Sequence, residues 1–176
     1  MTEYQYNLKA FGESLNNVKV YVKKHENTFD IQYQVELSSL LDLWDKQSSS
    51  LERKIGLWEG TCFEAFLYNK LNGEYIEFNF SGTGFWNAFH FKQRDQELKE
   101  YQNLKLRKHR FITSPQHRTF EVQIDLSELP FQVEEGHFLI GITCILVNGD
   151  QEKEYFAIKH CQEKPDFHDP DSFVSI

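Results

Sequence analysis

The chain has 176 residues, of which 40% are hydrophobic and 15% aromatic, so we expect one globular domain spanning residues 1–176 and no long disordered region. Its formal net charge is -8 and its sequence pI is about 5.4. Nucleic-acid binding needs a basic surface, and anionic membranes repel a chain of this sign, so we expect neither nucleic acid nor membrane as a partner.

The chain carries no pattern typical of a secreted or membrane-spanning protein. Its N-terminus lacks a basic start followed by an apolar run, and no stretch approaches the roughly 20 apolar residues of a spanning helix. Three widely spaced cysteines, Cys62, Cys144 and Cys161, form no CxxC pair, which favours a reducing compartment. These features together predict a cytoplasmic protein.

Alternating apolar and polar residues predict short strands along most of the chain. The predicted strands cover residues 4–11, 18–24, 28–37, 61–68, 74–81, 85–91, 104–112, 119–125, 138–147 and 154–160. Residues 38–55 break this pattern and predict one helical turn at Leu40–Trp44 within a long connection, while residues 161–176 are expected to form a loop. About ten strands and little helix predict an all-β antiparallel β-sandwich of jelly-roll or immunoglobulin-like type.

The stretch from Trp58 to Phe91 is the most aromatic part of the sequence, with eleven of the chain's 27 aromatic residues. Because successive side chains of a strand point to opposite faces, Tyr75, Glu77 and Asn79 share one face of their strand. Phe78, which lies between Glu77 and Asn79 in the sequence, points to the other face, and that face is predicted to pack against the core. The sequence therefore predicts an aromatic and polar surface suited to a small ligand, since a carboxylate accepts hydrogen bonds and an amide both donates and accepts.

The turn at Asn72-Gly73 leaves two registers open for this predicted hairpin. A two-residue turn pairs Phe66 with Asn79, and a four-residue loop pairs Glu64 with Asn79. Both registers place Glu64 and Glu77 on the same face. The two-residue turn separates these glutamates by about 13 Å, too far for a glycosidase acid and nucleophile, whereas a slipped register brings them closer.

No motif in the sequence predicts a metal site or a cofactor. The seven histidines lack ligand-like helical spacing, although His160 and His168 near Asp166 and Asp169 leave a zinc site open beside the simpler interpretation as a polar loop network. Methionine occurs only at Met1, which disfavours haem with His/Met ligation. We therefore expect no cofactor, no structural metal and no catalytic residue.

Three separated blocks of the sequence resemble a known family. LWEGTCFEAF, YIEFNFSGTGFWNAFHF and KPDFHDPDSF are similar in order and spacing to DOMON-like domains related to family 9 carbohydrate-binding modules, over residues 57–176. The closer resemblance is to stand-alone bacterial proteins of the DOMON-like group. The resemblance implies a β-sandwich that binds a small molecule, with a sugar as the expected ligand.

The resemblance also implies which residues bind the ligand. Trp58 and Glu64 match the Trp and Glu of the sugar-binding modules, and Asn79 matches their Asn, but Glu77 stands where those modules have an Arg. Phe167 stands in place of the Trp that closes the slot over the sugar. The predicted ligand-binding set is Trp58, Glu64, Glu77, Asn79, Phe167 and His168.

Three functions are consistent with these observations. The favoured hypothesis is a non-catalytic domain that stacks a sugar between aromatic rings and holds it by carboxylate and amide hydrogen bonds. The second is a protein-interaction or homo-oligomerisation module whose aromatic face is covered by a partner. The third is a glycoside-active enzyme that uses Glu64 and Glu77.

Overall fold

A computed structural model describes residues 2–36, 51–94, 96–104, 106–134 and 136–176. The strands are β1 (Thr2–Ala10), β2 (Asn17–Lys24), β3 (Thr28–Glu36), β4 (Glu52–Arg53), β5 (Cys62–Asn69), β6 (Tyr75–Ser81), β7 (Phe85–Phe91), β8 (Leu106–Thr113), β9 (His117–Asp125), β10 (Phe138–Val147), β11 (Lys153–Ala157) and β12 (Val174–Ser175). Three 3-10 turns are η1 (Leu57–Glu59), η2 (Leu126–Glu128) and η3 (Pro170–Ser172). The predicted all-β class with little helix is confirmed.

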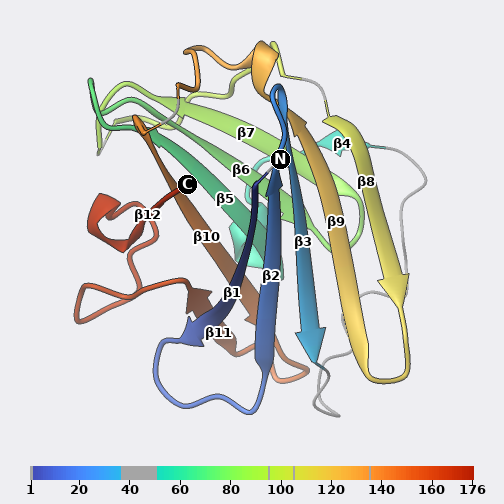
Figure 1. The fold of residues 1–176 in the computed structure, drawn as a ribbon. Coiled ribbons are helices and arrows are strands. Elements are labelled where there is room, and N and C mark those ends of the chain that lie inside the picture. The colour runs from blue at the N-terminus through green and yellow to red at the C-terminus, as the bar shows by residue number, and fades with distance from the viewer. Residues whose placement is uncertain (1, 37–50, 95, 105, 135) are drawn as a thin grey trace.

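The strands form a single curled sheet in the order β4-β7-β6-β5-β10-β11-β1-β2-β3-β9-β8, with β12 attached to β10 (Figure 1). Most neighbours are antiparallel, but the two-residue strand β4 runs parallel to β7, with Glu52 opposite Phe85. The sheet is therefore mixed, and the prediction of a wholly antiparallel arrangement is wrong. The parallel pair lies at one edge of the sheet, where β4 precedes η1 and β5 in the chain.

Strand β1 joins two parts of the curled sheet. Residues Thr2–Leu8 pair with β2, and the last residues of the strand, Lys9 and Ala10, pair with Ala157 and Phe156 of β11. The inner faces of the two parts pack against each other around the main hydrophobic core.

Tyr33 of β3 shows this contact between the two parts most clearly. Its ring lies 5.0 Å from that of Phe63 in β5, and its hydroxyl donates to the Glu64 carbonyl at 2.6 Å. The alternating apolar residues of the predicted strands thus form the interior, as expected for half-buried strands.

The outer face of the β5-β6-β7 part is covered by the chain itself. Every residue of β6 is buried, on both faces of the sheet. A second apolar cluster lies on this outer face and contains Phe66, Tyr75, Phe89, Phe91 and Phe173. Phe173 follows η3 in the C-terminal segment, and its ring stacks on that of Phe66 at 5.5 Å.

Gly141 of β10 makes the packing of Phe173 possible. A Cβ at this position would lie 2.3 Å from the Phe173 Cε1 atom, so only a glycine accommodates the ring. The C-terminal segment, predicted as a loop, also includes η3 and the short strand β12.

The connection between β3 and β5 is described only from residue 51 onward. The predicted helical turn at Leu40–Trp44 lies outside the described residues. The described part includes β4, which the sequence pattern did not predict because two residues carry no alternation. Nowhere in the described ranges is a helix long and apolar enough to span a membrane.

Candidate functional site

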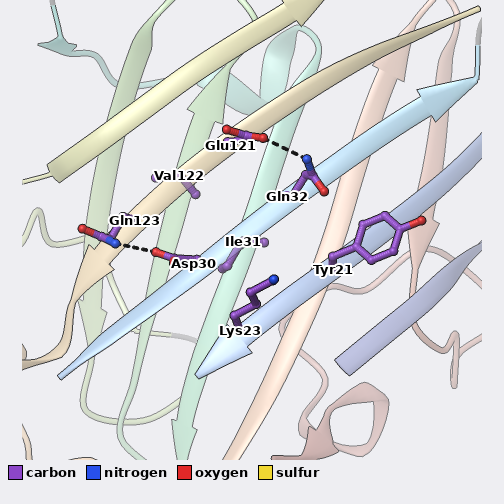
Figure 2. A pocket seen from close by; sticks show the side chains of 8 residues that line it. All are labelled: Tyr21, Lys23, Asp30, Ile31, Gln32, Glu121, Val122 and Gln123. Atoms are coloured by element: carbon purple, nitrogen blue, oxygen red, sulfur yellow. Dashed lines mark hydrogen bonds between the residues drawn. The ribbon is translucent and has the colours of Figure 1, made fainter. Parts of the chain in front are cut away.

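Two of the hollows on the described surface are similar in size and lie on different parts of the curled sheet. The first, of about 320 Å³, lies on the outer face of β2, β3 and β9. Figure 2 shows that its polar side chains pair with one another: Gln32 Nε2 donates to Glu121 at 2.8 Å, and Gln123 Nε2 donates to Asp30 at 2.6 Å. These cross-strand pairs account for the polar groups as a solvated sheet face, and this hollow contains none of the predicted site residues.

The second hollow, of about 270 Å³, lies over the outer face of β5 and β6 and is the candidate site. It is lined by Trp58, Glu64, Glu77, Leu98, Ile145, Tyr155, Pro165, Asp166, Phe167 and His168. Its volume lies just below the range of about 300–1,000 Å³ typical of pockets for drug-sized ligands, so it suits a small molecule. We call it the acidic cavity, because its floor carries two glutamates.

The register of β5 and β6 places both glutamates on this floor. Glu64 lies opposite Asn79, and Glu77 lies opposite Phe66. Of the two registers predicted, the one with the longer loop is therefore found. Gly73, at φ 77°, ends a loop in which its own N–H and the Leu71 N–H both donate to Asn69, so the turn begins earlier than Asn72.

This register corrects the distance expected between Glu64 and Glu77. The two residues are diagonal neighbours on adjacent strands, two positions out of register. Diagonal neighbours of this kind lie about 7–8 Å apart, so the separation of about 13 Å expected from the two-residue turn is wrong.

Hydrogen bonds hold one oxygen of each glutamate. Thr143 of β10 donates through its hydroxyl to Glu64 Oε2 at 3.0 Å, and Asn79 Nδ2 donates to Glu77 Oε1 at 2.8 Å. The second oxygen of Glu77, Oε2, and the side-chain oxygen of Asn79, Oδ1, are buried and have no hydrogen-bond partner among the described residues. Buried polar atoms of this kind are rare in native proteins. Because Glu77 lines the cavity and Asn79 does not, a ligand in the cavity could supply the missing donor to Glu77 Oε2.

Burial and mutual repulsion govern the charge of the two glutamates. Burial raises the pKa of Glu64 to about 8, with the neighbouring Glu77 carboxylate as the next cause. Burial likewise raises the pKa of Glu77 to about 7, opposed by the hydrogen bond from Asn79. The low-dielectric floor thus disfavours two negative charges side by side.

Trp58 forms one wall of the acidic cavity. It lies in η1, which begins after Gly56, a residue with φ 79° in the left-handed region that glycine tolerates best. Lys153 of β11 fixes this turn, because its Nζ donates to the Trp58 carbonyl at 3.1 Å. The indole ring contacts Phe89 edge-on at 5.9 Å, so its orientation is set by the apolar cluster beneath it.

A second wall of the acidic cavity comes from the C-terminal segment, which contributes Pro165, Asp166, Phe167 and His168. The Phe167 ring contacts the Tyr155 ring of β11 edge-on at 6.0 Å. The segment is held over the sheet by an ion pair between Arg94 and Asp166. This wall is therefore built from residues that are far apart in sequence.

His168 connects this wall to the floor. Its Nδ1 lies 2.9 Å from the Tyr75 hydroxyl, and its Nε2 lies 3.7 Å from Glu77 Oε2. The ring is packed edge-on against Phe66 and Phe91. His168 is thus fixed in place beside the oxygen of Glu77 that lacks a hydrogen bond.

The structure brings most of the predicted ligand-binding set together. Trp58, Glu64, Glu77, Phe167 and His168 all line the acidic cavity, whereas Asn79 is fully buried beside Glu77 and does not line it. Whether these residues bind a ligand remains a prediction.

Several lining residues were not predicted, among them Ile145 and Tyr155. They share the face of Glu64 because β10 pairs with both β5 and β11: Cys62 lies opposite Ile145, which lies opposite Tyr155. Such pairing between distant strands leaves no local signal in one sequence. Alternation within 154–160 could only have placed Tyr155 on one of two faces.

The histidines of the C-terminal segment do not converge on a metal site. Within the described ranges, no group of three or more His, Cys, Asp or Glu side chains is placed to hold a metal ion. His160 Nε2 instead lies 2.8 Å from the carbonyl of Lys9, and Gln162 donates to Asp169 at 2.7 Å. These contacts describe a polar network within the loop, the simpler of the two interpretations.

The fold is similar to solved carbohydrate-binding proteins. A protein from Bacteroides uniformis ATCC 8492, whose description as carbohydrate-binding is itself provisional, superposes with a TM-score of 0.68 at 12% identity, over 98% of this chain and 84% of that chain. A family 9 carbohydrate-binding module from Caldicellulosiruptor kristjanssonii in complex with cellotriose gives 0.58 at 8% identity, over 88% and 72%. A family 9 module from the same organism in complex with glucose gives 0.54 at 9% identity, over 85% and 70%. No protein-family model and no curated protein matches the sequence.

Proposed function

We propose that this protein binds a carbohydrate in the acidic cavity, without catalysing its conversion. The observation that carries the proposal is the combination of aromatic walls with an incompletely hydrogen-bonded polar floor. Trp58 and Phe167 both line the cavity, and Glu77 presents a buried oxygen that lacks a donor. Sugars offer apolar C–H faces to aromatic rings and hydroxyl donors to carboxylates, so this pattern matches their chemistry.

The structural neighbours support the same ligand class. Two of them are carbohydrate-binding modules in complex with cellotriose and with glucose, and they share this fold at 8% and 9% identity. Identity this low supports the fold only, so the residues of the cavity carry the ligand assignment. The order of the aromatic and acidic motifs leads us to propose further that the chain is a DOMON-like β-sandwich.

A protein-interaction role has less support from the structure. The aromatic residues of β5, β6 and β7 that could have formed an exposed interface are buried under the C-terminal segment of the same chain. Among the described residues, five large hydrophobic side chains are exposed, and they come from four different connections of the chain: Leu15, Leu51, Ile55, Leu71 and Leu98. A solution measurement of mass by light scattering would show an oligomer if this role were correct.

A glycoside-active enzyme remains the second candidate, because one observation favours it. Glu64 and Glu77 lie as diagonal neighbours at the cavity, and their pKa values are raised by burial. Inverting glycosidases hold their two carboxyls about 6.5–9.5 Å apart, a range that diagonal neighbours can reach. Release of p-nitrophenol from a panel of aryl glycosides, lost in Glu64→Gln, would establish this activity in place of simple binding.

The test of binding is a titration of the intact chain with a panel of mono- and oligosaccharides, followed by tryptophan fluorescence and by calorimetry. We expect at least one sugar to bind and Trp58→Ala to abolish its binding while the unfolding midpoint stays within a few degrees. Tyr21→Ala, on the outer face of β2, is the matched aromatic control and should leave affinity unchanged. Binding that survives Trp58→Ala would place the ligand elsewhere and refute the proposal.

A further inference from the structure

The charge of the acidic cavity narrows the ligand class. Among the described residues that line it are three carboxyl groups, those of Glu64, Glu77 and Asp166, and no lysine or arginine. Asp166 is ion-paired with Arg94, which leaves the two glutamates of the floor. His168 carries the only basic side chain among the described lining residues.

The geometry of Glu77 shows where a positive charge would be stabilised. Its side chain is in the lining of the cavity, the residue is 5% exposed, and Oε2 has no hydrogen-bond donor. One basic atom, His168 Nε2, lies 3.7 Å from this oxygen, beyond normal hydrogen-bond distance. A buried carboxylate is costly unless it is paired with a charge and hydrogen-bonded, and a hydroxyl group supplies only the hydrogen bond.

The walls favour a cation as well. Three aromatic residues, Trp58, Tyr155 and Phe167, line the same cavity as the two glutamates. Aromatic faces attract ammonium groups, and the attraction is greatest where water is displaced. A ligand that presents an apolar ring face together with a protonated amine uses both the walls and the floor.

We propose that the acidic cavity selects an amino sugar, whose protonated amine pairs with the Glu77 carboxylate between Glu64 and His168. This inference rests on the proposed function, because it specifies which carbohydrate the same site takes. The ammonium group donates to Glu77 Oε2, the atom left without a donor in the structure. A protonated amine also offsets the repulsion between the two glutamates, which a neutral hexose does not do.

The experiment is a calorimetric comparison, at pH 7 and low salt, of glucosamine, glucose, N-acetylglucosamine and tetramethylammonium. We expect glucosamine to bind about ten- to a hundredfold more tightly than glucose or N-acetylglucosamine, the gain typical of a charge-assisted hydrogen bond. In Glu77→Gln the ratio of glucosamine to glucose affinity should fall to about one. Glu121→Gln, a carboxylate on the outer face of β9, is the matched control and should keep the ratio.

The outcomes separate the two proposals. If a neutral sugar binds as tightly as glucosamine, or if Glu77→Gln keeps the ratio, the amino-sugar inference is wrong and carbohydrate binding stands. If neither these sugars nor the wider panel binds, the proposed function is wrong and the inference falls with it. If tetramethylammonium binds as tightly as glucosamine, the site recognises cations in general, which refutes the sugar assignment.

Discussion

Replacement of Glu77 by glutamine should stabilise the protein at alkaline pH and leave its stability nearly unchanged at acid pH. The substitution keeps an oxygen for the hydrogen bond from Asn79 Nδ2 but removes a carboxyl group that is 5% exposed. Because burial raises the pKa of Glu77 from 4.5 to about 7, the folded protein binds this proton more tightly than the unfolded chain. Below pH 4.5 the carboxyl group is neutral in both states and carries no penalty.

As the pH rises from 4.5 through 7, the unfolded chain ionises first, and the folded state loses stability relative to it. The difference between the pKa of Glu77 in the folded protein and in the unfolded chain corresponds to a loss of about 3 kcal/mol of stability once the carboxyl group is fully ionised, at about 1.4 kcal/mol per pKa unit. In a chain of this length, about 3 kcal/mol corresponds to a shift of roughly 6–12 °C in the unfolding midpoint. We therefore expect Glu77→Gln to melt well above the wild type at pH 8.5 and within about 2 °C of it at pH 4.5.

Thermal unfolding followed by circular dichroism at these two pH values, with urea titrations as a second measure, tests this prediction. Glu121→Gln provides the control, because its carboxylate lies on the polar outer face of the sheet beside Gln32. Its midpoint relative to the wild type should not depend on pH. If the unfolding midpoint of Glu77→Gln exceeds that of the wild type equally at both pH values, or more at pH 4.5, then the Glu77 carboxyl group is not held in a desolvated site.

Three further predictions concern the elements that build the cavity. Gly141→Ala should destabilise the protein by about 1–3 kcal/mol, because the new Cβ would overlap Phe173. The loss of stability in urea unfolding should be smaller when Phe173→Ala is already present. If the two substitutions instead destabilise the protein additively, the overlap is contradicted. Arg94→Gln should change global stability by less than about 1 kcal/mol, yet the backbone amides of residues 165–173 should exchange hydrogen faster. Unchanged exchange rates would show that the ion pair between Arg94 and Asp166 does not hold the C-terminal segment over the cavity. Tyr33→Phe should cost about 1 kcal/mol in urea unfolding through loss of the bond to the Glu64 carbonyl, and a neutral effect would mean that water replaces the hydroxyl.

The sequence was sufficient to predict every described strand except the two-residue strands β4 and β12, and the shared face of Glu64 and Glu77. Both follow from alternation, which is a local property of the chain. For the β5-β6 hairpin, the sequence left two registers open. The register in the structure depends on Asn69, whose side chain accepts a hydrogen bond from the Leu71 N–H, so that the loop begins earlier than the Asn-Gly pair suggests. That interaction is a side-chain hydrogen bond, which composition does not reveal.

The rest of the cavity depends on contacts between distant segments. Tyr155 reaches the site through the pairing of β11 with β10, and β10 pairs with β5. Only the resemblance to carbohydrate-binding modules predicted Phe167 as a lining residue, since nothing local marks a loop that folds back over the sheet. The parallel pairing of β4 was missed for the same reason, because a strand of two residues is defined by its partner.

A crystal structure of the protein with the most tightly binding sugar of the panel tests the central claim most directly. We expect ligand density in the acidic cavity, with a ring of the sugar against Trp58 or Phe167 and a hydrogen-bond donor of the sugar within about 3 Å of Glu77 Oε2. Density that lies instead over Tyr21 and Gln32, on the outer face of β2 and β3, would contradict it.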